Sequence, residues 1–193
     1  MERDEAARQD WRTRAETLPG RRIVVLDETS THLDMTSRYA RAPRGQRAYA
    51  RQRRNYGKNI TLLAGLRLEG MCAPFVVEGG VNTAVFETYI VHILLPTLQA
   101  GDILILDNLA VHKSARVRRM LHARGVSLLF LPAYSPDLSP IENAFAKLKA
   151  FLRRVRAQTI DALIEAIAQA LDSISPYDAI GFFVNAGFFN LDL

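Results

Sequence analysis

Two short apolar runs, each closed by an aspartate, restrict most strongly how this chain can fold. Residues 23–27 read Ile-Val-Val-Leu-Asp and residues 103–107 read Ile-Leu-Ile-Leu-Asp. Apolar runs of this length are typical of strands buried on both faces. A carboxylate at the end of such a strand is costly to bury unless something compensates its charge. One such aspartate would be read as a helix cap or loop anchor, but two matching ones favour a site shared by Asp27 and Asp107.

Glu142 is the candidate third member of this site. It begins a predicted helix from about residue 141 to 155, directly after Pro140. Thirty-four residues separate it from Asp107, and the helix and strand predicted between them would return the chain to the same side of the sheet. The alternative role of Glu142 is a first-turn charge that complements the helix dipole.

Three converging carboxylates are the ligands expected at a two-metal phosphodiester site. Two divalent cations about 3.5–4 Å apart serve the attacking and the leaving oxygen in such reactions. Mg²⁺ and Mn²⁺ prefer carboxylate and water oxygens as ligands. The sequence therefore predicts that Asp27, Asp107 and Glu142 hold two such ions and form the catalytic site of a nuclease.

Several neighbours of these carboxylates have open roles. Glu28 is expected to point to the opposite side of its strand from Asp27. His112 either orients a metal-bound water or contacts the scissile phosphate, or it is a helix-capping or surface residue. Lys113 lies at a predicted helix start, where a positive charge is slightly unfavourable. This position indicates that Lys113 contacts a phosphate. Asp137 is expected to shape the turn before Glu142.

The order of predicted elements indicates an α/β fold with a ribonuclease-H-like, mixed five-stranded sheet and helices on both faces. The predicted strands are residues 22–28, 60–68, 72–79, 102–107 and 127–132. The predicted helices lie within residues 1–20 and at 83–98, 113–124, 141–155 and 160–174. Three strands that can pair as a meander, followed by alternating strands and helices, favour this architecture, although doubly wound folds have a similar order. We expect residues 1–20 to be an N-terminal helical extension or linker and residues 21–193 to be the catalytic domain.

Composition narrows the classes further. The 193 residues suit one domain with a full core, and 49% hydrophobic against 23% charged residues argues against disorder. The single cysteine, Cys72, excludes an intramolecular disulfide and a cysteine-rich zinc site. No apolar run reaches the roughly 18 residues of a membrane span, and the charged first residues lack a signal-peptide core. We therefore expect a cytoplasmic protein with no membrane partner.

The net charge of +5 is concentrated in two stretches, 35–68 and 143–160, that contain no acidic residue. Basic clusters of this kind are typical of nucleic-acid binders, and tyrosines interleave with the first one. A solvated basic surface is the alternative. The predicted nucleic-acid contacts are Arg44, Arg47, Arg53, Arg54, Lys58, His112, Lys113, Lys147, Lys149 and Arg153.

Three segments carry a resemblance to a known family: LDET at 26–29, LDNLAVHK at 106–113 and LLFLPAYSPDLSPIENAFAKLK at 128–149. They resemble the DDE transposase domain of the bacterial insertion-sequence family six-thirty, in the Tc/mariner superfamily. The resemblance covers about residues 22–187. The LPAYSPDLSPIEN stretch, with its spacing from LDN, is its most specific part.

The resemblance implies a ribonuclease-H-like core and a triad of two aspartates and a third acid, which fall on Asp27, Asp107 and Glu142. It implies Mg²⁺ or Mn²⁺, cleavage of double-stranded DNA at transposon ends, and insertion into target DNA at a TA dinucleotide. A homodimer in the active complex and a nucleoid-associated, bacterial location are further expectations. The rival functions are another ribonuclease-H-fold nuclease and an inactive or domesticated DNA-binding fragment.

The sequence departs from the family pattern in two places. Ser139 stands where the family has asparagine, and because serine is also short and polar we expect the following helix to begin normally. Only about twenty residues precede the first predicted strand, too few for the helix-turn-helix domains of the family. An upstream helix-turn-helix partner chain is therefore a possible partner.

Overall fold

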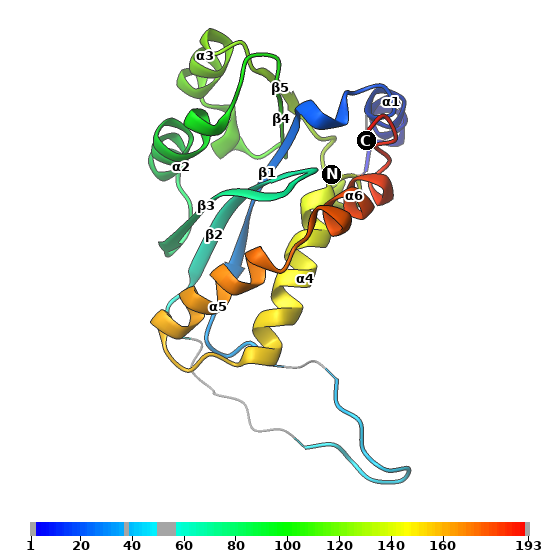
Figure 1. The fold of residues 1–193 in the computed structure, drawn as a ribbon, viewed down its shortest axis with the longest axis vertical. Helices are drawn as coiled ribbons and strands as arrows, with labels where there is room; N and C mark the ends of the chain where they lie inside the picture. The colour runs from blue at the N-terminus through cyan, green and yellow to red at the C-terminus, as the bar shows by residue number, and fades with distance from the viewer. Residues whose placement is uncertain (1–2, 37–38, 50–56, 192–193) are drawn as a thin grey trace.

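The structure is a computed structural model that describes residues 3–36, 39–49 and 57–191. A five-stranded sheet in the order β3-β2-β1-β4-β5 forms its centre (Figure 1). β1 pairs antiparallel with β2 and β2 with β3, whereas β1–β4 and β4–β5 are parallel pairs. The predicted mixed α/β sheet is confirmed. The strands are β1 (Ile23–Thr31), β2 (Ile60–Arg67), β3 (Gly70–Glu78), β4 (Ile103–Leu106) and β5 (Ser127–Phe130).

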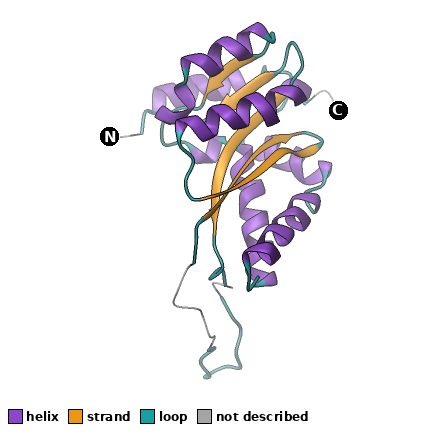
Figure 2. Cartoon of the chain, turned by 90° about the vertical axis from the view of Figure 1, so that its left-hand side faces the viewer, coloured by secondary structure: helices purple, strands orange, loops and turns teal. Residues whose placement is uncertain are grey.

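Helices cover both faces of the sheet (Figure 2). One face carries α1 (Glu5–Ala15), α4 (Pro140–Val155), α5 (Ile160–Asp172) and α6 (Pro176–Asn185). The other face carries α2 (Thr83–Tyr89) and α3 (Ala115–Ala123). Within the described ranges, no helix combines the length and apolar character that a bilayer crossing requires.

Alternation along β1 divides the core into two halves. Ile23 and Val25 belong to the cluster under α4, whereas Val24 and Leu26 belong to the cluster under α2 and α3, and all four are at most 1% exposed. Successive side chains of a strand point to opposite faces. Asp27 therefore follows Val25 toward α4, and Glu28 follows Leu26 toward α2.

The helix α4 lies across the centre of the sheet because one stripe of its surface is apolar. Ile141, Phe145, Leu148 and Leu152 recur at helical spacing and are at most 2% exposed. They pack on β1 and β2. The first turn of α4 is thereby fixed above the ends of β1 and β4.

The expected helix from 83 to 98 is interrupted, and this part of the prediction is wrong. The α-helix ends at Tyr89, a π-helical turn follows over Ile90–Leu94, and a 3₁₀ turn covers Leu95–Thr97. Pro96 has no N–H and its ring clashes with the carbonyl four residues earlier, so a regular helix cannot continue through it.

The helix predicted within residues 1–20 is observed as α1, whereas α6 was not predicted. The N-terminal helix α1 buries Trp11 and Ala15 in the same core as α4, although the boundary at residues 20 and 21 stays a prediction. The helix α6 begins with a capping box formed by Ser175 and Asp178, and it packs Phe183 against Phe188 with ring centroids 5.5 Å apart.

Candidate active site

Neighbouring parallel strands deliver Asp27 and Asp107 to one place. Val25 of β1 pairs with Ile105 of β4, so the two aspartates, each two residues further on, occupy equivalent positions. Val25 and Ile105 both face α4, and alternation gives the aspartates the same direction. The matching apolar runs thus end side by side, as the sequence predicts.

A pocket of about 490 Å³ contains Asp27, Asp107 and Glu142 in its lining. The first turn of α4 supplies Glu142, and the segment from residue 131 to 139 forms a wall of the pocket. The structure therefore brings the three predicted carboxylates to one cavity. The remaining lining residues are Asn108, Leu109, Lys113, Leu131, Pro132, Ala133, Tyr134, Ser135, Pro136 and Ser139.

The carboxylates in this pocket influence one another electrostatically. Burial raises the pKa of Asp27 to about 7, the backbone N–H of Glu28 opposes this at 2.8 Å, and the charges of Asp107, Glu28 and Glu142 add to the rise. A cluster of mutually repelling carboxylates is stabilised by a bound cation. The donor set, which is all carboxylate oxygen, fits Mg²⁺ or Mn²⁺.

The side chains of Asp27, Asp107 and Glu142 line one pocket but do not surround a single point. In the described part of the chain, no three His, Cys, Asp or Glu side chains are grouped tightly enough to surround a single ion. The side chains of Asp107 and Glu142 are accessible, with Asp107 32% exposed and Glu142 at the surface.

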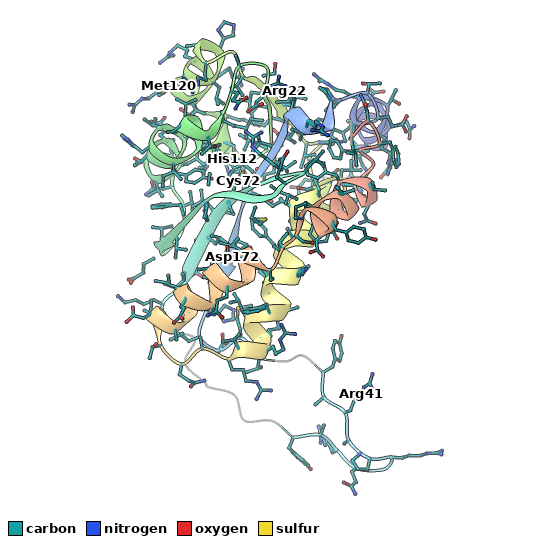
Figure 3. All side chains as sticks on the ribbon, viewed as in Figure 1. Arg22, Arg41, Cys72, His112, Met120 and Asp172 are labelled. Carbon is teal, nitrogen blue, oxygen red and sulfur yellow. The ribbon has the colours of Figure 1, made fainter. Side chains whose placement is uncertain are left out.

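His112, labelled in Figure 3, contacts both Asp107 and Glu28. Its Nδ1 contacts Asp107 Oδ1, and its Nε2 lies 3.2 Å from Glu28 Oε2. The ring is 1% exposed and packs on Phe86, with centroids 4.6 Å apart. Burial alone would lower the pKa of His112, but the hydrogen bonds and charges of Asp107 and Glu28 raise it to about 9. His112 is therefore a buried imidazolium that fixes the orientation of Asp107.

This placement limits what His112 can do. Both ring nitrogens face carboxylates, so neither is available for the phosphate contact that the sequence suggested as one option. Glu28 lies on the α2 side of β1, as alternation predicts, and acts on Asp107 through His112. The sequence signal was present, because Glu28 follows Asp27 and His112 stands five residues after Asp107.

We expect His112→Phe to reduce metal-dependent DNA cleavage by about 10–100-fold, as loss of a partner behind a metal ligand typically does. Phenylalanine keeps the packing on Phe86 but removes both donors. His112→Asn, which can restore one donor toward Asp107, should recover part of the loss. The Mg²⁺ concentration needed for half of the thermal stabilisation should rise in the same order. An unchanged metal response in His112→Phe, matching the exposed control His92→Asn, would rule out this orienting role.

The segment before Glu142 is anchored from a distant part of the chain. Asp137 accepts hydrogen bonds from Arg8 Nη1 at 3.0 Å and Nη2 at 2.6 Å, and from Arg3 at 2.6 Å. The Arg8 hydrogen bond lowers the pKa of Asp137. The side chain of Arg8 is 3% exposed, so α1 holds the turn that the sequence assigned to Asp137 alone.

Ser139 precedes α4, which begins at Pro140 as predicted. Its hydroxyl does not cap the helix, and its Oγ is buried with no hydrogen-bond partner among the described residues. Pro140 at the first helical position needs no N–H partner. The helix therefore begins normally without the asparagine of the family pattern.

The predicted DNA contacts in the first basic stretch fall into three groups. Arg44 and Arg47 are exposed on the segment 39–49. Lys58 forms an ion pair with Glu78 at 2.7 Å. Arg53 and Arg54 lie outside the described residues.

The DNA contacts predicted outside the first basic stretch also differ in their surroundings. Lys113 is exposed and lines the pocket. Lys147 donates to Asp178 at 2.7 Å and to the Ser173 carbonyl at 3.1 Å, which joins α4 to α6. Burial is the largest cause that lowers the pKa of His32, and the positive charges of Lys149 and Arg153 lower it further.

Comparison with known proteins identifies the family. A model of the DDE superfamily endonucleases matches residues 22–164, which include all three carboxylates. The chain belongs to the DDE superfamily endonucleases. The predicted DDE family is confirmed, and the relatives given below are Tc1 and mariner transposases, while the narrower resemblance to the bacterial insertion-sequence family six-thirty stays a prediction.

Individual relatives of this DDE superfamily endonuclease agree. The Tc1 transposase of Caenorhabditis elegans is 34% identical over 90 residues, which are 47% of this chain and 33% of that protein. A Mos1 transposase paired-end complex with the left transposon end superposes with a TM-score of 0.79 at 20% identity, covering 94% of this chain and 57% of that one. The isolated catalytic domain of Mos1 mariner transposase gives 0.66 at 17% identity, covering 96% of this chain and 92% of that domain. These likenesses confirm the ribonuclease-H-like fold.

Proposed function

We propose that the chain is the catalytic domain of a DNA transposase, which cleaves DNA at transposon ends and joins those ends to target DNA. The observation that carries the proposal is the pocket that Asp27, Asp107 and Glu142 share within a DDE endonuclease fold. The chain spans about a third of Tc1 transposase and just over half of the Mos1 chain in its DNA complexes. The activity of a complete transposase is therefore proposed for this chain from its catalytic domain alone.

Both proposed reactions replace one oxygen on phosphorus by another. The oxygen of water, or of a DNA 3′-hydroxyl, bonds to phosphorus while the leaving oxygen takes the electron pair of the broken bond and then a proton. Divalent cations supply charge stabilisation for the attacking and leaving oxygens. Two solved Mos1 paired-end complexes carry Mn and Mg. We propose two such ions here, with Asp27, Asp107 and Glu142 as their ligands.

The chain's own residues divide the remaining tasks. Asp27 and Asp107 are fixed by rigid strands, and His112 orients Asp107. Glu142 completes the ligand set from the first turn of α4. Lys113, exposed in the pocket lining, places a positive charge beside the phosphodiester. Leu131, Pro132 and Tyr134 also line the pocket, and we propose that they limit how far the DNA enters.

The proposed partners follow from the same relatives. Mos1 has been solved as paired-end, strand-transfer and pre-cleavage complexes. We propose that this chain acts as a homodimer on two transposon ends, inserts at TA dinucleotides, and receives end recognition from helix-turn-helix domains. A bacterial, nucleoid-associated location fits this role.

The test is a strand-transfer assay. Labelled duplexes with an exposed 3′-hydroxyl end are incubated with a supercoiled target plasmid, the protein and Mn²⁺. We expect covalent joining of the labelled strand to the plasmid, at TA sites. Cleavage of the RNA strand of a hybrid without joining would instead support another ribonuclease-H-fold nuclease. Absence of both joining and nicking would support an inactive DNA-binding fragment.

A further inference from the structure

A second cavity, of about 490 Å³, runs along the outer edge of β5. It is separate from the catalytic pocket and contains none of the three carboxylates. Basic side chains from two helices reach into it: Arg14 from α1, and Arg118 and His122 from α3. Strand β5 and Val126, the residue before it, form the floor of the groove.

The floor of this groove is an open sheet edge. In the described part of the chain, β5 is the last strand of the sheet. The N–H of Ser127 donates to the carbonyl of Asp102, just before β4, at 2.9 Å, and the N–H of Leu131 donates to the carbonyl of Leu106 in β4 at 2.8 Å. Backbone groups of a parallel strand alternate between its two sides, so the N–H groups of Leu128 and Phe130 point into the groove. A sheet edge with free N–H groups is available to an acceptor-rich ligand.

On the α3 and β5 sides of the groove the charge is one-sided, whereas α1, which supplies Arg14, also carries Glu5 and Asp10. Residues 108–136 contain no acidic residue, and this third acid-free stretch covers α3 and β5. Val117 and Leu121 bury one stripe of α3, and the flank that carries Arg118 and His122 lines the groove. Arg116, which does not line it, is paired with Glu87 at 3.4 Å. Figure 1 shows α3 and α1 at the same end of the molecule as β5.

The groove is connected to the catalytic pocket by a short segment. Lys113 lines the pocket, and the next residue, Ser114, caps α3 by accepting from Val117 N–H. Nine helical residues span about 13 Å, so basic side chains continue from the pocket along α3 to the groove. Arginine is well suited to phosphate oxygens because its guanidinium donates two parallel hydrogen bonds.

We propose that the β5 groove binds the phosphate backbone of the DNA that extends beyond the catalytic pocket. Arg14 and Arg118 hold phosphates from opposite walls, and the free N–H groups of β5 lie between them. The proposal rests on the proposed function for the identity of the ligand as DNA. The groove adds contacts outside the scissile position, so it determines how tightly flanking DNA is held rather than how fast the phosphodiester is cut.

The test compares the salt dependence of duplex binding among the wild type and two charge variants. The double variant Arg14→Gln/Arg118→Gln removes one positive charge from each wall of the groove. Arg119→Gln is the matched control, because Arg119 is exposed on the same helix but does not line the groove. Each phosphate contact contributes about 0.9 to the slope of log affinity against log salt. We expect the double variant to lose about 2 from the slope, so the wild type should lose about tenfold more affinity than the double variant between 50 and 200 mM salt.

Nicking of a short duplex that does not reach the groove, in Mn²⁺, is measured in parallel. Unchanged nicking with a reduced slope in the double variant supports the proposal. If the wild type fails to nick but the slope still falls, the groove proposal stands and the proposed function fails. Equal slopes in the double variant and Arg119→Gln would overturn the proposal. Concentration-dependent dimerisation with equal slopes would overturn it in favour of strand pairing between copies at β5.

Discussion

Asp107→Asn is expected to abolish metal-dependent DNA cleavage, with a loss of about a thousandfold or more. The substitution keeps the shape of the side chain and removes the charge that a divalent cation requires. Cations at such sites contribute several kcal/mol of transition-state stabilisation, and each 1.36 kcal/mol is tenfold in rate. Nicking of supercoiled DNA in Mn²⁺ measures the effect. Asp172→Asn, an exposed aspartate at the end of α5, is the control and should cleave normally.

Metal binding to the same variant is measurable without DNA. At about a hundred times its dissociation constant, a ligand stabilises the folded state by about 2.7 kcal/mol, which corresponds to roughly 5–10 °C in Tm for a chain of this size. We expect Mg²⁺ or Mn²⁺ to raise the Tm of the wild type by this order and to have little effect on Asp107→Asn. Equal rises in the two proteins would remove Asp107 from the metal site.

Asp27 should make the metal-free protein less stable as the pH rises. Its folded pKa is about 7, whereas the unfolded value is about 3.9. The unfolded state therefore releases its proton first, and the free energy of unfolding falls between about pH 4 and pH 7 and stays low above that. The full shift corresponds to about 4 kcal/mol, and water that reaches the pocket reduces this, so we expect about 2 kcal/mol.

The measurement is urea unfolding in EDTA at pH 5 and pH 8, for the wild type and Asp27→Asn. Since pH 5 already lies above the unfolded pKa, this interval covers only part of the shift, and the asparagine variant should gain about 1 kcal/mol relative to the wild type. His112, whose pKa is raised to about 9, keeps its proton in the folded state while the unfolded histidine loses its proton above about pH 6.5, which also lowers the stability over part of the range. Comparison of the two proteins at equal pH cancels this contribution. Saturating Mg²⁺ should restore the wild type at pH 8. A constant difference at both pH values would contradict the burial of Asp27 among other carboxylates.

Local patterns were sufficient to predict the sheet and the place of the three carboxylates. The runs ending at Asp27 and Asp107 are apolar at every position before the aspartate, which favours buried strands, and the parallel pairing of β1 with β4 puts their ends together. The stripe of α4 follows helical spacing from Ile141 to Leu152 and orients Glu142 without further information. These features depend on residues close together in the chain.

Features that depend on distant residues escaped prediction. The contact of Arg8 with Asp137 joins residues 129 positions apart, and the only local signal is that Arg8 shares a helical face with Trp11 and Ala15. The role of His112 depends on the side of the sheet that Glu28 occupies. The interruption of the helix predicted over residues 83–98 is the exception, because its signal is local. Pro96 stands in the sequence, but the apolar periodicity around it favoured a continuous helix.

The anchoring of Asp137 means that the third carboxylate has a support outside the region that the family model matches. Residues 22–164 include Glu142 but exclude Arg8 and Trp11. A fragment cut at residue 21 would leave the turn before Glu142 without its two arginines and would expose the core surface that Trp11 covers. Movement of α1 away from the sheet would have the same local effect, so the position of this helix controls how firmly Glu142 is held.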